Sequence, residues 1–201
     1  MIQRLGVEPR RRAILAAAGE AFAGTPYDRV SVARVAASAG VSEALVHKYF
    51  GSKPGLYVAV VQIAVRRLLD RQRRADAELG PDAPPRRRLA RSIEVYLDSI
   101  EAWAGGWAGP FQSPSTEPAE AARLRADTRR GYVELLRDVL GLAAAPALDY
   151  TLAGYLGFLD AACLAWVRAG HPADHRAAIV EAALAALDGA LAAVGHPGAL
   201  D

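Results

Sequence analysis

The stretch VSEALVHKYFGSK, residues 41–53, gathers side chains that could contact a polyanion. Lys48 and Lys53 are the only lysines of a chain that carries 24 Lys and Arg residues in total. Ammonium and imidazole groups, such as that of His47, can bind phosphate oxygens, and a carboxylate can accept from a base amine. For Glu43 we favour a simpler role as a first-turn acid that complements the positive end of a helix. The two lysines could instead be solvated surface charges.

Two short helices are expected to position this stretch. Ser31 and Ser42 each precede a short run of apolar residues at helical spacing, where a serine hydroxyl can accept from an otherwise unpaired backbone N–H. Gly40 lies between the runs, where the chain needs a positive φ to turn from one helix into the next. Two helices that cross through a short turn need a small residue where they touch and an apolar residue on the second helix. Ala36 and Val46 lie at the positions for these two roles. The pattern predicts a helix-turn-helix.

The second helix of this motif has an inner apolar side and an outer polar side. Val35, Val41 and Tyr49 can complete the inner side, and the residues left to point largely outward are Ser42, Glu43, Leu45, His47 and Lys48. A short helix with such an outer side fits the major groove of DNA. Residues 1–60 carry eight Arg and Lys against four Asp and Glu, and the remainder carries 16 against 18. An anionic partner is therefore expected at the N-terminal end.

Over residues 10–60 the sequence resembles the TetR family of transcriptional repressors. The resemblance rests on Phe22-Ala23-Gly24, Tyr27, Val30-Ser31-Val32, Val35-Ala36, Ala39-Gly40-Val41-Ser42, Tyr49-Phe50, Ser52-Lys53 and Leu56. It implies an all-α fold with three N-terminal helices for DNA and a larger helical domain for ligand binding and dimerisation. We place the boundary between a DNA-binding domain of residues 1–55 and a domain of residues 56–201, because the helical intervals become long there.

The resemblance also implies which residues bind DNA. The predicted set is Ser31, Arg34, Ser42, Glu43, Ala44, Leu45, His47, Lys48, Tyr49 and Lys53. Ser42 would cap the recognition helix, the next residues would face bases or sugar–phosphate, and Lys48, Tyr49 and Lys53 would contact phosphate. The family often has Thr, Tyr and His where this chain has Leu45, His47 and Lys48, so the operator preference of relatives does not carry over. The arginines at 10–12 could form an N-terminal arm or begin a solvated helix.

Helical spacing recurs along the whole chain, and signals for strands are weak. The expected helices lie near residues 9–23, 31–38, 42–49, 53–79, 84–104, 117–140, 146–169 and 173–194. Glycine and proline make the interval 105–118 the expected irregular segment. The helix over 53–79 would leave the DNA-binding domain and enter the ligand domain, so it would act as the lever between them.

Aromatic residues near the irregular segment predict a small-molecule site in the larger domain. The predicted ligand-binding residues are Tyr96, Trp103, Trp107, Phe111, Tyr132, Tyr155, Leu159, Asp160 and Cys163. Their character predicts a largely apolar effector, which the tyrosine hydroxyls would orient. Asp160 lies between apolar stripes, and a carboxylate buried there must be paired or protonated. For any one of the aromatic residues, plain core packing is the simpler explanation.

The last two long helical intervals are apolar on more than one side. Gly154, Gly157, Ala161 and Ala165 form a face of small residues beside a stripe of large ones. The resemblance implies that these helices pair with those of a second subunit. The predicted interface is Gly157, Ala161, Ala165, Ile179, Leu184, Leu187 and Leu191. A two-fold dimer suits a pseudo-palindromic operator, and the alternative is a monomeric bundle with both helices internal.

Motifs for an enzyme or a metal site do not occur in the sequence. There is no phosphate loop, Gly-x-Ser-x-Gly or dinucleotide fingerprint. His171 and His175 have a metal-ligand spacing, but Gly170 and Pro172 indicate a turn there and no third ligand lies at an obvious offset. We expect no catalytic residue, metal or cofactor. A single cysteine, and the lack of a signal-peptide core or of about 18 consecutive apolar residues, predict a cytoplasmic protein without membrane contact.

Together these patterns predict a homodimer that binds double-stranded operator DNA and regulates transcription. The preferred hypothesis is a repressor that leaves its operator when an unidentified small-molecule effector binds. The effector would favour a conformer in which the spacing between the two recognition helices no longer fits the operator. Two alternatives stay open. One is a transcriptional activator of the same fold, since repression or activation depends on where the operator lies. The other is a helical ligand-binding protein whose DNA binding has degenerated.

Overall fold

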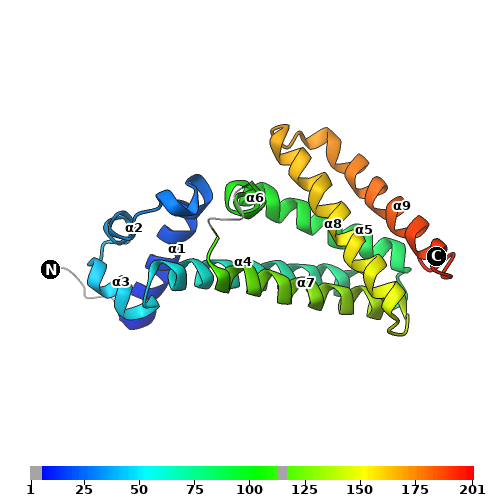
Figure 1. Cartoon of the computed structure of the whole chain (residues 1–201), viewed down its shortest axis with the longest axis horizontal. Helices are drawn as coiled ribbons and strands as arrows, with labels where there is room; N and C mark the ends of the chain where they lie inside the picture. Colours follow the sequence, from blue (N-terminus) through cyan, green and yellow to red (C-terminus); the bar gives the residue numbers. More distant parts are fainter. Residues whose placement is uncertain (1–5, 113–116) are drawn as a thin grey trace. The chain divides into compact units, whose positions relative to one another are not determined.

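The computed structural model describes residues 6–112 and 117–201, and these residues form helices without a strand (Figure 1). The helices are α1 (Val7–Gly24), α2 (Val32–Ser38), α3 (Glu43–Phe50), α4 (Lys53–Leu79), α5 (Pro85–Ala102), α6 (Ala104–Gln112), α7 (Ala119–Leu140), α8 (Pro146–Arg168) and α9 (Arg176–Ala193), with 3-10 turns η1 (Tyr27–Arg29) and η3 (Ala173–His175). The predicted all-α fold is confirmed.

Packing divides the chain into two compact units. Unit 1 is Met1–Arg66 with Trp103–Leu124, and unit 2 is Arg67–Ala102 with Arg125–Asp201. Helices α4 and α7 each contribute one part to unit 1 and the other part to unit 2. The boundary expected between residues 55 and 56 divides the chain by function rather than by packing, and it stays a prediction.

In unit 1 the helix-turn-helix forms around two serine caps and a glycine. The hydroxyls of Ser31 and Ser42 accept hydrogen bonds from the backbone three residues on, at 3.4 and 3.3 Å, so both predicted caps are present. Gly40 has φ +66°. The N–H of the next residue, Val41, reaches back to the carbonyl of Ala36 at 3.0 Å. This bond closes the turn between α2 and α3.

The core of unit 1 fixes which side of α3 points outward. Val35 and Ala36 of α2 and Val46 of α3 are only 1–2% exposed, as the inner side of the motif requires. They belong to a cluster that also contains Ile14, Ala18, Phe22, Val30, Leu56, Tyr57 and Val61. Because Val46 is anchored in this cluster, the residues on the opposite side of α3 remain at the surface.

Helix α6 lies in the interval 105–118 that the sequence predicts to be irregular, which corrects that expectation; residues 113–116 of the interval lie outside the described part. The helix packs against α1 within unit 1. A Cβ on Gly105 would lie 1.8 Å from the carbonyl oxygen of Ala23, so only glycine allows this approach. The indole N–H of Trp103 donates to a carbonyl of α1 at 3.2 Å. Tertiary packing therefore overrides the low helix propensity of the glycines.

Unit 2 is built mainly on α5, α8 and α9. Helices α8 and α9 lie side by side, and α9 also packs against α5 (Figure 1). The large side chains that these helices bury to 0–1% exposure are Leu97, Ile100, Leu148, Leu152, Leu184, Leu187 and Leu191. By length and composition alone α8 could also cross a membrane, a property that core helices of soluble proteins share.

Candidate nucleic-acid interface and apolar groove

Helix α3 presents most of its predicted DNA-binding residues to solvent. The exposed ones are Ser42, Glu43, Ala44, His47 and Lys48, whereas Leu45 and Tyr49 are half-buried. On α2, Arg34 is exposed and Ser31 is half-buried, with its hydroxyl used in the cap. The structure thus brings the predicted residues of α3 to one polar surface, and their contact with DNA stays a prediction.

Glu43 and His47 form a pair on this surface, one helical turn apart. Nε2 of His47 lies 3.6 Å from Oε1 of Glu43, and the side chains are 47% and 51% exposed. Nδ1 of His47 lies 3.2 Å from the carbonyl oxygen of Gly51, just after the end of α3. A carbonyl oxygen can only accept, so Nδ1 carries a proton and donates it to Gly51. Both ring nitrogens therefore have defined neighbours.

Lys53 contacts two groups of its own unit. Its Nζ donates to the carbonyl of Asp28 at 3.0 Å and lies 4.6 Å from the centre of the Tyr27 ring. Burial raises the pKa of Tyr27, with further contributions from Tyr57 and Glu120. An ammonium has three N–H donors, so the bond to Asp28 leaves others for a phosphate. Sequence reasoning missed these partners because η1 lies 25 residues before Lys53.

The arginines at 10–12 lie inside α1 and not on an extended arm. Of the two alternatives, the structure therefore has the one in which they belong to the start of a helix. The guanidinium of Arg11 lies 5.5 Å from the centre of the Phe50 ring, at the end of α3. This cation–π contact joins the first and third helices of unit 1. Residues 1–5 lie outside the described residues.

The residues predicted to bind a ligand are divided between the two units. Trp103, Trp107 and Phe111 belong to unit 1, where the rings of Trp107 and Phe111 have centres 5.0 Å apart. The others belong to unit 2: Tyr96, Tyr132, Tyr155, Leu159, Asp160 and Cys163. The bond from Trp103 to α1 shows that this tryptophan packs in unit 1. Its sequence position alone did not distinguish that role from ligand binding.

Among the predicted ligand-binding residues of unit 2, Asp160 carries the carboxylate that binds other polar side chains. Its side chain is 16% exposed. One oxygen accepts from the Tyr96 hydroxyl at 2.9 Å, and the other accepts from Arg129 at 2.5 Å. The carboxylate is therefore paired, as its surroundings require. Sequence reasoning missed Arg129, which lies 31 residues away among other arginines of α7.

A second polar network lies one helical turn away on both α5 and α7. The hydroxyl of Tyr132 donates to Oε1 of Gln72 at 2.7 Å, and Nε2 of Gln72 donates to the Ser92 hydroxyl at 2.9 Å. Burial raises the pKa of Tyr132, although the bond to Gln72 opposes this, so the hydroxyl stays a donor. The network joins α4, α5 and α7, and its glutamine and serine carried no signal in the sequence.

Cys163 and Tyr155 are core residues of α8, at 0% and 5% exposure. Burial raises the pKa of the Cys163 thiol to about 12, with a smaller contribution from Asp160. Burial likewise raises the pKa of Tyr155. The thiol is therefore protonated at neutral pH and a poor nucleophile. Within the described residues, no three His, Cys, Asp or Glu side chains are grouped to hold a metal ion.

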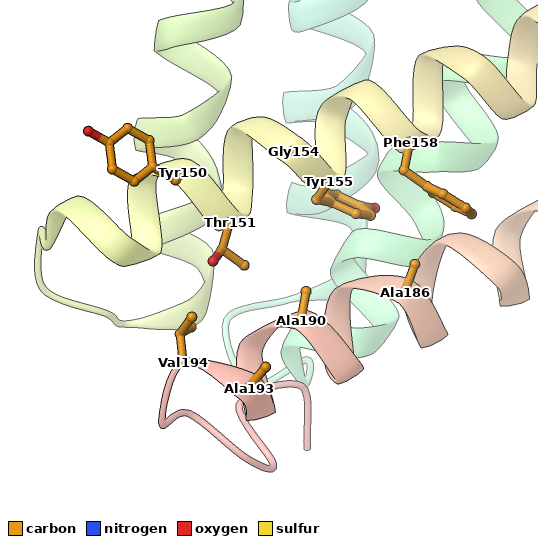
Figure 2. A pocket seen from close by; sticks show the side chains of 9 residues that line it. All are labelled: Tyr150, Thr151, Gly154, Tyr155, Phe158, Ala186, Ala190, Ala193 and Val194. Carbon is orange, nitrogen blue, oxygen red and sulfur yellow. The ribbon is translucent and has the colours of Figure 1, made fainter.

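An open apolar groove of about 390 Å³ runs between α8 and α9 (Figure 2). Its residues, here the α8–α9 groove, are Tyr150, Thr151, Gly154, Tyr155, Phe158, Ala186, Ala190, Ala193 and Val194. Figure 2 shows the methyl groups of Ala186 and Ala190 pointing from α9 toward α8. Phe158 is 42% exposed and Tyr150 is 78% exposed. The groove therefore leaves large apolar side chains in contact with water.

Some of the residues predicted at a subunit interface lie on the exposed surface of α8, and others lie in the core of unit 2. Gly157, Ala161 and Ala165 are exposed on α8, and Ile179 of α9 is half-buried. The leucines Leu184, Leu187 and Leu191 are 0–1% exposed in the core of unit 2. These three leucines, which the resemblance assigned to the subunit interface, thus pack inside the chain. Of the predicted interface residues, Gly157, Ala161, Ala165 and the half-buried Ile179 remain available to a second subunit.

The helix-turn-helix has counterparts in known proteins. Residues 14–60 match the family described as bacterial regulatory proteins, tetR family. The helix-turn-helix domain of this chain belongs to the TetR family. It is 34% identical over 126 residues to the HTH-type transcriptional activator FasR of Mycolicibacterium smegmatis, a match that covers 62% of this chain. The chain spans only 56% of the length of that relative.

Solved structures of TetR regulators share the fold. A tetR-family transcriptional regulator from Streptomyces coelicolor superposes with a TM-score of 0.81 at 24% identity, over 94% of this chain and 83% of that one. The regulator FadR from Bacillus subtilis, in complex with stearoyl-CoA, gives 0.70 at 16% identity, over 88% and 98%. At these identities the likeness establishes the helical architecture alone. Residues 14–60 accordingly match the helix-turn-helix of TetR regulators, and the whole chain shares their helical architecture.

Proposed function

We propose that this TetR-family regulator is a dimer that binds an operator and is released from it by a small, largely apolar effector. The observation that carries the proposal is the outward side of α3. Ser42 caps the start of this helix, and Val46 anchors it in the core. Its polar side chains remain free to enter a major groove. On this proposal residues 1–55 read DNA and residues 56–201 bind the effector and the second subunit, in the cytoplasm and without a catalytic role.

The exposed side of α8 supports the dimer. Phe158 and the exposed Gly157, Ala161 and Ala165 present apolar and small residues that water solvates poorly. A second copy of the same surface would cover them, as the two-fold interface of a homodimer does. Two subunits would then hold their α3 helices about 34 Å apart, which is one turn of DNA.

The polar networks of unit 2 support an effector site there. The Tyr96, Asp160 and Arg129 side chains bind one another among apolar residues of α5, α7 and α8. Ligand sites of this kind combine an apolar lining with a few polar groups that orient the ligand. The FadR structure contains stearoyl-CoA, which makes molecules with long apolar chains a reasonable first class to screen. Gln72 of α4 joins the neighbouring network, so α4 is the helix through which occupancy would act on DNA binding.

Activation is the second candidate function, because FasR is named a transcriptional activator. The same DNA-binding surface serves both roles, and the position of the operator decides between them. A reporter driven by the promoter of the chain's own gene would separate them. Repression predicts higher reporter output when the protein is deleted, and activation predicts lower output.

Fluorescence anisotropy tests operator binding most simply. The probe is a duplex of the DNA that flanks the gene, compared with a scrambled duplex of the same composition at several salt concentrations. We expect binding to the flanking duplex that is at least about 10³-fold tighter than to the scrambled one. Equal binding to both at every salt concentration would contradict a sequence-specific regulator.

The effector mechanism makes a reciprocal prediction. A ligand that weakens operator binding must itself bind the protein–DNA complex less tightly than the free protein, by the same factor. Calorimetry with free protein and with the complex measures both affinities. Equal ligand affinity in the two titrations would rule out release by a shift of population.

A further inference from the structure

The hydrogen bond of His47 to the backbone decides which of its nitrogens meets a partner. Nδ1 donates to the Gly51 carbonyl at 3.2 Å, one of the carbonyls at the end of a helix that lack a partner inside the helix. A neutral imidazole has one N–H, and this bond uses it. Nε2 of the neutral ring is therefore a bare acceptor on the exposed side of α3.

Glu43 places a second acceptor beside the first. Its Oε1 lies 3.6 Å from Nε2 of His47, which is longer than a hydrogen bond. When the ring is neutral and the carboxylate is ionised, neither of these two atoms carries a proton to donate. Two exposed acceptors thus lie side by side on the recognition helix. In water they are solvated, but in a DNA groove they need a donor, because an acceptor left unpaired on desolvation weakens binding.

We propose, on the basis of the DNA-binding function proposed above, that Glu43 and His47 recognise a cytosine in the major groove. Base pairing leaves one N–H of the cytosine amino group free there, and the two acceptors share it as a bifurcated hydrogen bond. Only cytosine N4 and adenine N6 are donors on base edges there. In adenine the acceptor N7 adjoins the amino group, so it would face Glu43 or His47, which are acceptors too. Cytosine has no acceptor on its own major-groove edge, so this conflict does not arise. Thymine and guanine offer only acceptors in the groove, and the phosphates repel the Glu43 carboxylate.

The proposal gives Glu43 a different role from a first-turn acid that stabilises the helix dipole. A dipole role is independent of the base sequence, because it acts within the protein. Base recognition instead predicts a loss of discrimination at one position of each half-site. A variant that preserves the size of the Glu43 side chain, and one that keeps the donor of His47, separate the two roles.

Selection from a random duplex library with the purified full-length protein provides the test. Glu43→Gln keeps the shape but adds an amide donor, and glutamine pairs with adenine through N6 and N7. His47→Asn keeps a donor within reach of Gly51 and removes the atom that corresponds to Nε2. Glu20→Gln, at an exposed site on α1, is the matched control for the loss of one carboxylate from unit 1.

We expect the wild type to select an operator with a C·G pair at one position of each half-site. Glu43→Gln should shift that position toward adenine and reduce the preference for cytosine by about tenfold or more. His47→Asn should reduce the preference at the same position, and Glu20→Gln should leave the selected sequence unchanged. Replacing the paired guanine by 7-deazaguanine should not change wild-type affinity, because the amino group of cytosine is the contact.

Three results would overturn the proposal, and they differ in what they leave standing. Failure of the wild type to select any sequence would remove the DNA-binding function together with this inference. A selected operator whose base preferences are identical for wild type, Glu43→Gln and His47→Asn would leave the function and remove the cytosine contact. Loss of affinity with 7-deazaguanine would show that the contact at this position is to guanine N7, and it would remove the cytosine contact.

Discussion

Helices α3 and α8 each bury one side in their own unit and leave the other side at the surface, but the two exposed sides have opposite chemistry. On α3 the exposed residues include Glu43, His47 and Lys48. On α8 they include Phe158 and small residues such as Ala161. Both helices are anchored by fully buried apolar side chains, so the buried sides do not differ in kind. The residues that are left outside therefore indicate what each helix binds.

The two surfaces also differ in what their contacts demand. A polar partner must satisfy each donor and acceptor on α3, so single atoms matter there. An apolar partner on α8 needs only shape and area, since the hydrophobic effect is non-directional. Substitutions should accordingly act on α3 through specificity and on α8 through assembly.

The largest effect is expected when a charge is placed in the α8–α9 groove. Phe158→Arg should dissociate the dimer, because an arginine in an apolar interface must be desolvated without a partner. Operator affinity should then fall on the order of a hundredfold or more, since a single subunit loses the effective concentration of the second α3. Sedimentation equilibrium and anisotropy measure the two changes.

Leu135→Arg is the matched control for this prediction. Leu135 lies on α7 and is 42% exposed, the same exposed fraction as Phe158. The control should remain dimeric and bind DNA normally. Dissociation by both variants, or by neither, would show that the exposed side of α8 is not a subunit interface.

The two sides of α8 should also differ in their effect on stability. Leu152 is 0% exposed and Tyr150 is 78% exposed, half a turn apart. Leu152→Ala should lower the free energy of unfolding by about 2–5 kcal/mol, and Tyr150→Ala by less than about 0.5 kcal/mol. Urea denaturation followed by circular dichroism measures both. Similar losses for the two variants would contradict the assignment of the inner and outer sides.

A smaller change is expected for a phosphate contact on α3. Lys48→Gln should weaken binding to specific and scrambled duplexes by about the same factor and reduce the salt slope by about one. Arg73→Gln, at an exposed position on α4 in unit 2, controls for the loss of one positive charge. If Lys48→Gln altered the selected base sequence without changing the slope, Lys48 would be a base contact instead.

The smallest effect concerns a polar pair of unit 2 that lies away from both surfaces. A bidentate hydrogen bond from Arg88 at 2.6 Å lowers the pKa of Asp76, against an opposing effect of burial. A depressed pKa stabilises the fold above the unfolded pKa of about 3.9, and that contribution is lost as pH falls through the folded value. Because Asp76 is 39% exposed, we expect less than about 1 kcal/mol.

Asp76→Asn tests this contribution by chemical denaturation at two pH values. The variant should be less stable than wild type at pH 7. The difference should begin to shrink near pH 3.9 and reach zero below the lowered folded pKa, where the carboxylate is protonated in both the folded and the unfolded chain. Arg88→Gln should remove the same pH-dependent part, and the double variant should lose little more. A stability difference that stays constant across this pH range would show that the pair does not act through ionisation.

Short-range spacing allowed the helix-turn-helix to be predicted in detail. Ser31, Gly40 and Ser42 each perform a job that depends on neighbours within about four residues, so their positions in the sequence were sufficient. The prediction that Val46 lies inside follows from the same local geometry. The helices of unit 2 were also predictable, because apolar periodicity is a local signal.

Features that depend on distant partners were not predictable in this way. Helix α6 forms because Gly105 allows close packing on α1, and its own composition argued for a loop. Arg129 could not be chosen as the partner of Asp160 without knowing that α7 lies beside α8. Helix α9 is apolar on several sides, so periodicity could not decide whether Leu187 faces the core or a second subunit.

The composition of the protein–DNA complex tests most directly whether the two surfaces act together. Sedimentation velocity of the wild-type protein with its selected operator gives the number of chains bound to each duplex. We predict two chains on an operator with two half-sites centred one DNA turn apart, and no stable complex of one chain with one half-site at the same concentration. A single chain bound to a half-site with the full operator affinity would contradict the account.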